Sequence, residues 1–330
     1  MITIDKARNW ESYRNHWTEL IASVQWYDSD VPMHYSPEEE LEELESAFIN
    51  KEGIFLLAKD GRAKIRGLLG VRCKGNVAKV RPWEPLVAAD TSLYYVGQVL
   101  LGAARTELRR KGIETLLATL KYSIDEIDSA KQLRELYLSC DFNLTRYVGI
   151  QLIADLTQLD TAHRGPQDMI IRNIDTIDMD RVTEHVLRAY MSTPGDRSIH
   201  GNDPGVSTAE GIMRALNQVT SGSLGTMKPG LYKQGFKDGT LAGFILAVIR
   251  NRPYYPRHGL IFLFGVFPEF RRQGIGQALL YELGKTLKEY GCEYTFVGTP
   301  KENQPAINCY IDAGFEPNSW VEFYSTELNP

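Results

Sequence analysis

The sequence of 330 residues has no long hydrophobic run and few cysteines. No stretch approaches the roughly 18 uninterrupted apolar residues of a membrane-spanning helix, and residues 1–5 do not begin a basic and apolar signal segment. The four cysteines, Cys73, Cys140, Cys292 and Cys309, form no C-x-x-C pair, so neither a zinc site nor a redox motif is indicated. We therefore expect a cytoplasmic globular protein without a bound metal.

An excess of one charge is also missing. The net charge of −5 is shared almost evenly between the two halves of the chain, so neither half resembles a nucleic-acid-binding surface. With 43% hydrophobic and 24% charged residues, the composition is that of an ordinary globular protein. At about 100–200 residues per domain, the length predicts two domains.

The apolar pattern from position 169 onward predicts one α/β domain. Strands are expected at 169–174, 230–236, 241–249, 260–266, 293–297 and 320–328, and helices at 179–191, 209–219, 274–290 and 303–313. Residues 193–206, rich in Pro, Gly and Asp, are predicted to form a loop. The run 260–266 is apolar throughout, so it should be a central strand. This order describes a sandwich with a mixed sheet, not a doubly wound nucleotide fold.

The first half repeats this order more loosely. Helices are expected at 10–21 and 38–48, strands at 54–58 and 65–73, and a strand at 93–101 that leads into a helix through Gly112. This assignment aligns Arg109–Ile113 with Arg271–Ile275, Leu136–Phe142 with Cys309–Phe315, and Val148–Leu156 with Trp320–Leu328. The first copy is then shorter by about one strand. We predict domains at residues 1–160 and 169–330, joined by a polar linker at 161–168.

The segment after the central strand carries the strongest chemical signal. Pro268 ends the strand pairing, and the loop that follows opens the long helix. Gly274 and Gly276 let the backbone approach a ligand, while free N–H groups and the helix dipole favour an anion. Arg271 and Arg272 add positive charge beside them. The arrangement suits a pyrophosphate, although a third glycine for a dinucleotide motif is missing.

Two motifs, in order along the chain, resemble the GCN5-related N-acetyltransferase (GNAT) superfamily. They are Val266-x-Pro268-x-x-Arg271-x-x-Gly274-x-Gly276, similar to motif A, and Asn303-x-x-Ala306-x-x-x-Tyr310-x-x-x-Gly314-Phe315, similar to motif B. The resemblance covers residues 168–330 and reaches the first half only through the repeat. It implies two tandem acyl-CoA N-acyltransferase domains, each a mixed, mostly antiparallel sheet flanked by helices, and acetyl-CoA as the cofactor.

The resemblance also implies roles for particular residues. Tyr310 would be catalytic and protonate the departing thiolate, although it could instead be a simple core residue. Backbone groups of Phe264 and Val266 would bind the pantetheine arm, and Asn303 would bind a pantetheine amide or cap its helix. The implied cofactor-binding residues are Phe264, Gly265, Val266, Arg271, Arg272, Gln273, Gly274, Ile275, Gly276, Gln277 and Asn303.

The first copy departs from motif A. In the alignment above, Glu114 takes the place of Gly276, where a carboxylate would crowd the loop and repel a pyrophosphate. Ala104 and Thr106 stand where Val266 and Pro268 stand. We therefore predict a degenerate first domain.

The general base remains open at this point. Family members often use a glutamate on the strand before motif A, and residues 260–266 contain none. Glu302, Glu322, His258 and water stay as alternatives.

We expect an acetyl-CoA-dependent N-acetyltransferase that acetylates a primary amine by direct attack, with a small molecule favoured as the acceptor. Two alternatives remain: an enzyme similar to mycothiol synthase, which also has tandem domains, and a non-catalytic CoA-binding regulatory module. No nucleic-acid or membrane partner is expected. The acceptor and the oligomeric state are not indicated by the sequence.

Overall fold

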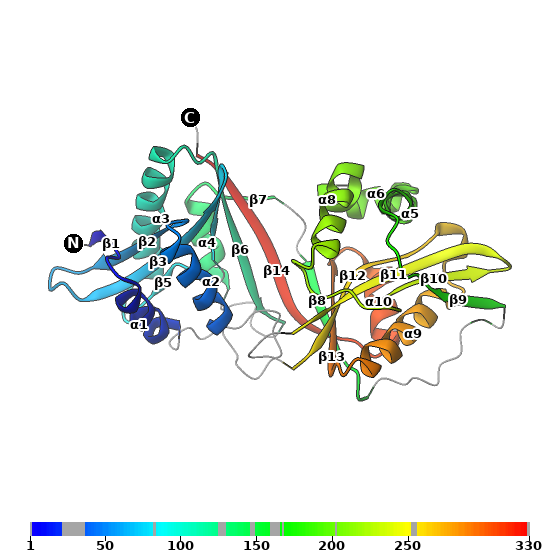
Figure 1. Cartoon of the computed structure of the whole chain (residues 1–330). Coiled ribbons are helices and arrows are strands. Elements are labelled where there is room, and N and C mark those ends of the chain that lie inside the picture. Colours follow the sequence, from blue (N-terminus) through cyan, green and yellow to red (C-terminus); the bar gives the residue numbers. More distant parts are fainter. Residues whose placement is uncertain are drawn as a thin grey trace. The chain divides into compact units, whose positions relative to one another are not determined.

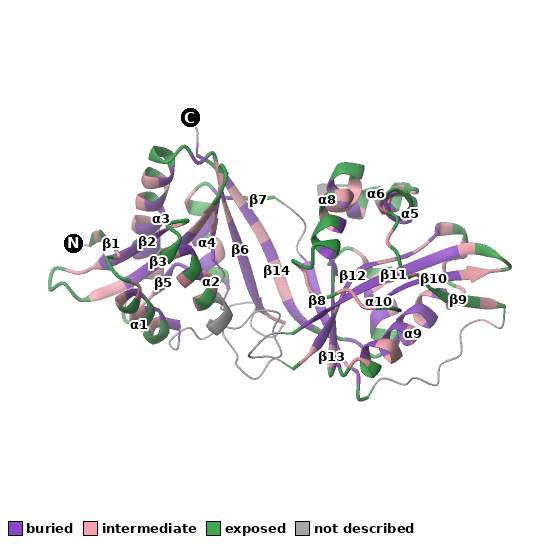
Figure 2. Cartoon of the chain, in the orientation of Figure 1, coloured by how far each residue is buried: buried purple, intermediate pink, exposed green. Residues whose placement is uncertain are grey.

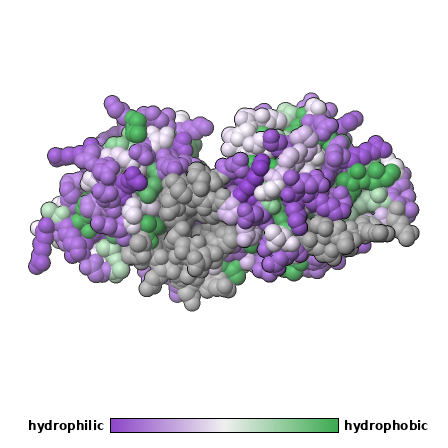
Figure 3. Space-filling view, turned by 60° about the horizontal axis from the view of Figure 1, so that its bottom comes forward, coloured by the Kyte–Doolittle hydropathy of each residue, from purple (hydrophilic) through white to green (hydrophobic). Residues whose placement is uncertain are grey.

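The structure, a computed structural model, describes residues 2–21, 37–81, 84–124, 130–145, 149–158, 166, 168–201, 203–251 and 256–328. The chain forms two compact units. Unit 1 comprises Met1–Val148 and Ser319–Pro330, and unit 2 comprises Gly149–Asn318 (Figure 1). On the face drawn in Figure 3, hydrophilic residues predominate and apolar residues are scattered among them. Within the described ranges, no helix is both long and apolar enough to cross a membrane.

Unit 1 is a mixed sheet with helices on both faces. Its helices are α1 (Trp10–Ile21), α2 (Pro37–Ile49), α3 (Leu93–Arg110) and α4 (Lys131–Ser139). Its strands are β1 (Thr3–Lys6), β2 (Gly53–Lys59), β3 (Ile65–Lys74), β4 (Val77–Val80), β5 (Leu86–Val87), β6 (Thr115–Ser123), β7 (Asn143–Leu144) and β14 (Glu316–Glu327). The sheet order is β1-β2-β3-β4-β6-β14, with β5 on β3 and β7 on β14, and β4 and β6 are parallel.

Unit 2 has the same layers. Its strands are β8 (Gly149–Asp155), β9 (Met169–Asn173), β10 (Tyr232–Lys237), β11 (Thr240–Arg250), β12 (His258–Val266) and β13 (Tyr294–Pro300). Its helices are α5 (Met179–Met191), α6 (Pro194–His200), α7 (Pro204–Ser207), α8 (Ala209–Thr220), the 3-10 turn η1 (Pro268–Phe270), α9 (Ile275–Glu289) and α10 (Gln304–Asp312). The sheet order is β8-β13-β12-β11-β10-β9, and the pair of β12 and β13 is parallel.

The centre of unit 2 is buried on both faces of its sheet. Phe244, Leu246 and Val248 of β11 pack with α5 and α8. On the opposite face, Leu279 of α9 comes close to the backbone of β11 at Gly243, where an added Cβ would lie 3.4 Å from its Cδ1. The two-sided burial is complete in β11, which is buried from Ala242 to Arg250, as the purple strands of Figure 2 show. In β12, buried and half-buried residues alternate along the apolar run 260–266.

The sequence predicts the second half well. The expected strands at 230–236, 241–249, 260–266 and 293–297 correspond to β10, β11, β12 and β13, and β12 is central as expected. The helices expected at 274–290 and 303–313 correspond to α9 and α10. The turn between β10 and β11 has positive φ at both Asp238 and Gly239, as a tight hairpin requires.

The prediction of a loop at 193–206 is wrong, because α6 and α7 lie there. The Thr193 side chain accepts a hydrogen bond from the backbone N–H of Asp196, and the Asp196 carboxylate accepts one from the N–H of Thr193. Asp203 caps α7 in a similar way. Residues that are typical of loops act here as helix caps, so composition alone misled the prediction.

The strand predicted at 93–101 is also wrong. These residues open α3, whose buried positions Val96, Leu100, Ala104 and Leu108 recur every four residues, a helical period. Ser92 caps the helix by accepting a hydrogen bond from the N–H of Tyr95.

The predicted alignment of the two copies changes as a result. Gly112 follows the end of α3 with a φ of 73°, and β6 comes next rather than a helix, whereas Gly274 precedes α9. The match of Arg109–Ile113 with Arg271–Ile275 is therefore wrong, because one segment ends a helix and the other opens one. The first copy has not lost a strand either, since β6 follows α3 as β13 follows α9. Glu114 lies before β6 and accepts a hydrogen bond from Asn76, so it does not stand at a phosphate loop.

The last strand of each half pairs outside its own half. β8, from the first half of the chain, pairs with β13 in unit 2. β14, the last strand of the chain, pairs with β6 in unit 1, where Trp320 lies opposite Tyr122. The predicted linker at 161–168 lies outside the described residues except for Pro166 and Asp168. Separate folding of residues 1–160 and 169–330 thus stays a prediction.

Unit 1 should depend on β14 for its stability. A chain shortened to residues 1–158 leaves β6 with an unpaired edge and removes Glu322, which accepts hydrogen bonds from Tyr122 and Arg134. A second chain joins residues 1–148 to 318–330 through a short Gly-Ser loop. We expect cooperative thermal unfolding, followed by circular dichroism, from the joined chain only. Equal cooperativity in both chains would show that β14 is dispensable.

Candidate active site

A cavity of about 520 Å³ lies in unit 2 where β12 ends and α9 begins. Its walls come from the end of α5, from α6, from the end of β12, from the first turn of α9 and from α10. Of the sequence-predicted site residues, the lining includes Phe264, Gly265, Val266, Arg271, Arg272, Gly274, Ile275, Gly276, Gln277 and Asn303. These residues are therefore brought together around one space, whereas Gln273 and Tyr310 are not part of its lining.

The edge of β12 is open beside this cavity. β12 pairs with β13 from His258 to Ile261, and among the described residues its ladder partner from Leu263 to Val266 is β11 alone. The register shifts between Leu246 and Ala247, which lie opposite Leu263 and Ile261, so Phe262 is the extra residue of β12. Beside the cavity, β12 therefore has a neighbouring strand on one side.

The start of α9 is left open for an anion. Gly274 occupies the N-cap position with a φ of 78°, and no side chain caps the helix. Other helices of unit 2 have side-chain caps, supplied by Asp178, Thr193, Asp203, Thr208 and Asn303. Ile275, Gly276 and Gln277 line the cavity. Because the first backbone N–H groups of a helix lack partners within it, this uncapped end suits a phosphate group.

Gly276 serves the packing of α9 as well as the approach of a ligand. A Cβ at this position would lie 3.1 Å from both Cys309 Sγ and Phe264 Cζ. The glycine therefore lets α9 come close to α10 and to β12. From the sequence, we predicted only that Gly276 lets the backbone approach a ligand.

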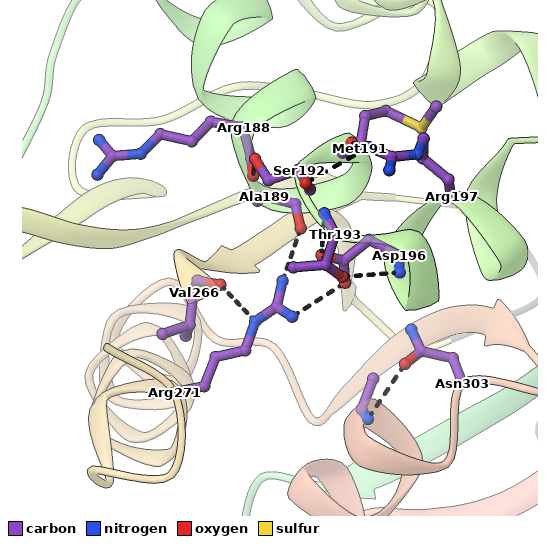
Figure 4. Close-up of polar contacts among 11 residues, drawn as sticks. Arg188, Ala189, Met191, Ser192, Thr193, Asp196, Arg197, Val266, Arg271 and Asn303 are labelled. Carbon is purple, nitrogen blue, oxygen red and sulfur yellow. Dashed lines mark hydrogen bonds and ion pairs between the residues drawn. The ribbon is translucent and has the colours of Figure 1, made fainter. Parts of the chain in front are cut away.

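Arg271 makes structural contacts that the sequence did not predict (Figure 4). Its Nε donates to the Val266 carbonyl at 3.1 Å, and a terminal nitrogen donates to the Ala189 carbonyl at 2.8 Å. Its other terminal nitrogen lies 2.9 Å from Asp196 Oδ1. The guanidinium thus joins the ends of β12 and α5 to α6, and its charge is already paired with a carboxylate.

Asp196 is the acidic partner in this contact. Its side chain is only 11% exposed, and it also accepts a hydrogen bond from the Thr193 hydroxyl at 2.7 Å. Burial acts to raise the pKa of Asp196, but the hydrogen bonds from Thr193 and Arg271 and the Arg271 charge outweigh it and lower the pKa.

The neighbours of Arg271 in the loop differ in their environment. Arg272 lines the cavity, is exposed, and has a φ of 61°. Gln273 instead donates to the Glu269 carbonyl at 3.1 Å and accepts from Lys237. Arg272 is therefore better placed than Arg271 to meet a negative charge in the cavity.

Side chains already engage the β12 backbone groups that were predicted to bind pantetheine. The Tyr190 hydroxyl donates to the Phe264 carbonyl at 2.9 Å and accepts from the Phe264 N–H at 3.3 Å. The Val266 carbonyl accepts from Arg271. A pantetheine arm at Phe264 would thus compete with the Tyr190 hydroxyl, a contact that the sequence did not indicate.

Tyr310 lies on α10 beside the cavity and is only 4% exposed. Its ring packs between Phe264 and Phe315, with centroids 5.6 Å from each. The hydroxyl has no hydrogen-bond partner among the residues that the structure describes. Burial, and to a smaller extent Tyr190 and Cys309, raise the pKa of Tyr310 well above its ordinary value, so the hydroxyl keeps its proton.

Asn303 both caps α10 and lines the cavity. Its Oδ1 accepts from the Ala306 N–H at 3.4 Å, and its Nδ2 donates to Thr299 Oγ1 at 3.1 Å. The two alternatives for Asn303 were a cap and a cofactor contact. The cap is observed.

The three side chains considered as a general base do not line the cavity. Glu302 is exposed beside Lys301, at 3.9 Å. His258 is buried at the start of β12, away from the open end of the strand. Glu322 belongs to unit 1, where it accepts hydrogen bonds from Arg134, which lower its pKa against the effect of burial.

Sequence reasoning missed the wall formed by α5 and α6. Tyr190, Asp196, Ile199 and His200 all line the cavity. The spacing Thr193-x-x-Asp196 is a capping-box pattern and could have revealed α6. Nothing in the sequence indicates that Asp196 pairs with Arg271, which lies 75 positions away.

Comparison with known proteins identifies the class of this site. Residues 221–315 match the acetyltransferase (GNAT) family. A curated relative, an N-alpha-acetyltransferase of Sulfurisphaera tokodaii, is 33% identical over 95 residues, which cover 26% of this chain and 57% of the relative. The match to this relative thus spans little more than half of its length.

Solved structures share the fold over the whole chain. A GCN5-related N-acetyltransferase from Sphaerobacter thermophilus superposes with a TM-score of 0.66 and 18% identity, covering 100% of this chain and 96% of the other. A tandem GNAT protein from the clavulanic acid biosynthesis pathway gives 0.55 and 16%, covering 100% and 99%. The chain thus has the fold of these GNAT structures, a tandem member among them, and its match to the acetyltransferase (GNAT) family lies at residues 221–315.

The contact between Arg271 and Asp196 should stabilise unit 2. The folded-state pKa of Asp196 is below its ordinary value, so the stabilisation is complete above about pH 4 and is lost as the pH falls through the folded-state pKa. Asp196→Asn should lower the melting temperature at pH 7 and weaken the loss of stability on acidification. A double-mutant cycle with Arg271→Met should give a coupling of about 0.5–3 kcal/mol.

The matched control is the pair of Arg188 and Glu269, which also joins α5 to the segment before α9 but is almost half exposed. An exposed pair is worth about 0–1 kcal/mol. Equal coupling in the two pairs would mean that the Arg271 contact has no special structural role.

Proposed function

We propose that the protein is an acetyl-CoA-dependent N-acetyltransferase that transfers an acetyl group to a primary amine, with a small molecule favoured as the acceptor. The uncapped start of α9 carries this proposal, because it opens into the same cavity as the end of β12, where side chains and not a strand bond the backbone. A diphosphate fits the first feature, and an extended amide-containing arm fits the second. The family match at residues 221–315 supports the same conclusion.

Each part of the cavity would have its own task. The backbone N–H groups at Ile275, Gly276 and Gln277 would hold the diphosphate, and Arg272 would add a positive charge. When bound, acetyl-CoA supplies an activated acyl thioester. Tyr310 keeps its proton at neutral pH and would donate it to the departing sulfur. Tyr190 and Arg271 would hold the end of β12 in place against α5.

Turnover separates the candidate functions. A non-catalytic CoA-binding module would bind acetyl-CoA and release no free CoA with any amine. The curated relative is an N-alpha-acetyltransferase, so an acceptor screen should include peptides with free α-amino groups beside small amines. An enzyme similar to mycothiol synthase would release CoA only with an amine that resembles the acceptor of mycothiol synthase. Free CoA, followed over this panel, tests the proposed function.

Unit 1 should not bind a second cofactor. The start of α3 takes the place of the start of α9, but it has no glycine loop. Ser92 caps it, and the exposed carboxylate of Asp90 lies just before it, paired with Arg66. A capped helix start next to a carboxylate is a poor site for a diphosphate.

We therefore expect one tight acetyl-CoA site per chain. Isothermal titration calorimetry measures the stoichiometry directly, and Gly276→Glu serves as the matched variant in unit 2. Its carboxylate would oppose the diphosphate and its Cβ would press on Cys309 and Phe264, so binding should be lost. Two comparable sites per chain would contradict the assignment of the cofactor to unit 2 alone.

Tyr310→Phe tests the proposed proton donor. The ring still packs between Phe264 and Phe315, so acetyl-CoA affinity and melting temperature should change little. The kcat should fall by about 10²–10⁴, the range for a positioned acid. Tyr137, at the corresponding place on α4, is the control, because its hydroxyl donates to the Glu84 carbonyl at 2.6 Å. Tyr137→Phe should cost about 0.5–1.5 kcal/mol of stability and leave kcat unchanged.

A Tyr310→Phe variant that melts earlier but turns over normally would assign Tyr310 to the core. Protonation of the sulfur would then fall to water.

A further inference from the structure

His200 is a histidine of the cavity wall that the predicted mechanism does not use. It is the last residue of α6 and is 9% exposed. Its ring stacks on Tyr190, with centroids 4.5 Å apart and an angle of 16° between the planes. In the described part of the chain, its ring nitrogens have no hydrogen-bond partner, and neither of them is fully enclosed. A polar ring in this position is open to a group that enters the cavity.

A series of contacts connects His200 with Tyr310. Tyr190, on which His200 stacks, binds the backbone of Phe264 through its hydroxyl. The Phe264 side chain packs against Tyr310. Contacts therefore run from His200 through Tyr190 and Phe264 to Tyr310, with Phe264 in the middle. A proton acceptor and a proton donor are thus both linked by contacts to Phe264, in the strand segment along which the thioester arm is proposed to bind.

Burial favours the neutral form of His200 near pH 7. Burial is the largest influence and lowers the pKa of its imidazole. Asp196 on α6 and Asp203 at the start of α7 act in the opposite direction, and Arg271 reinforces the lowering. The Tyr190 hydroxyl, which faces the ring from α5, has a pKa raised to about 12 and so carries no charge. The neutral imidazole is the form that accepts a proton.

A second buried histidine of unit 2, His185, serves as a comparison, because it does not reach the cavity. His185 on α5 is also 9% exposed, and burial lowers its pKa too. Its ring packs against Phe244 and Phe267, and its Nδ1 is fully enclosed without a partner among the described residues. His185 does not line the cavity. The two histidines share burial and electrostatic shift, and only His200 has access to a ligand.

We propose that His200 is the general base that removes a proton from the acceptor ammonium. This assignment rests on the proposed acetyltransferase function. The ammonium gives one proton to the imidazole, and the neutral nitrogen forms a bond with the thioester carbonyl carbon. The carbon–sulfur bond then breaks, and the sulfur takes the Tyr310 proton. The second nitrogen proton returns to Tyr310 through water, and His200 releases its proton to solvent. The products are an N-acetyl amide, CoA thiol and one proton.

The test compares His200→Gln with His185→Gln in the full chain, using an amine found in the acceptor screen. For the wild type, kcat/KM should rise with pH as His200 loses its proton, with a midpoint below the ordinary histidine pKa of about 6.5. In His200→Gln this rise should disappear and kcat should fall by about 10²–10⁴, while calorimetry shows unchanged acetyl-CoA affinity. His185→Gln should keep the rise, whatever its melting temperature.

His200→Phe retains an aromatic stack on Tyr190 and guards against a folding defect. It should lose the same pH-dependent rise as His200→Gln. A wild-type chain that turns over, with the rise and kcat intact in both His200 variants, would overturn the assignment of the base alone. A wild-type chain that binds acetyl-CoA but acetylates no amine would overturn the proposed function, and the assignment of His200 with it.

Discussion

The guanidinium of Arg271 is the contact on which the geometry of unit 2 depends. It bonds the last carbonyl of β12, the end of α5 and the Asp196 carboxylate of α6. One planar group with several donors in a fixed arrangement can meet all three at once, which a lysine cannot do. The loop before α9 and the wall that carries His200 are thereby joined. A motif residue that was predicted to bind the cofactor thus also holds together the walls of the cavity.

The open start of α9 and the closed start of α3 show how one fold can gain or lose a ligand site. Both helices come after the fourth strand of the main antiparallel run, β4 or β12, and precede a strand that is parallel to it. Gly274 leaves the N–H groups of α9 without a side-chain cap, and Ser92 satisfies one in α3. A cap stabilises a helix but occupies the groups that bind a phosphate. The two units therefore share an order of elements, but the start of α9 is open to an anion and the start of α3 is capped.

The sequence was informative where burial and glycine geometry decide the structure. The apolar run 260–266 and the loop through Gly274 predicted β12, α9 and the cavity between them, because few structures satisfy such a pattern. The prediction failed at 193–206, where the same residue types form loops and cap helices. It also failed at 93–101, where a short apolar run fits the period of a helix as well as that of a strand. It did not reveal the structural contacts of Arg271, whose partners lie in distant segments. Contacts between distant segments, which place His200 and Asp196 in the cavity wall, leave no local pattern.

The exchange of β8 and β14 has a consequence for the order of synthesis. Unit 2 is a continuous stretch of chain placed between the two parts of unit 1. Domains generally fold as units during synthesis, the N-terminal one first. Here β6 waits for a later segment, because its partner β14 follows the whole of unit 2 along the chain. Unit 2 has all its strands before β14 is synthesised, so the unit that begins second is finished first.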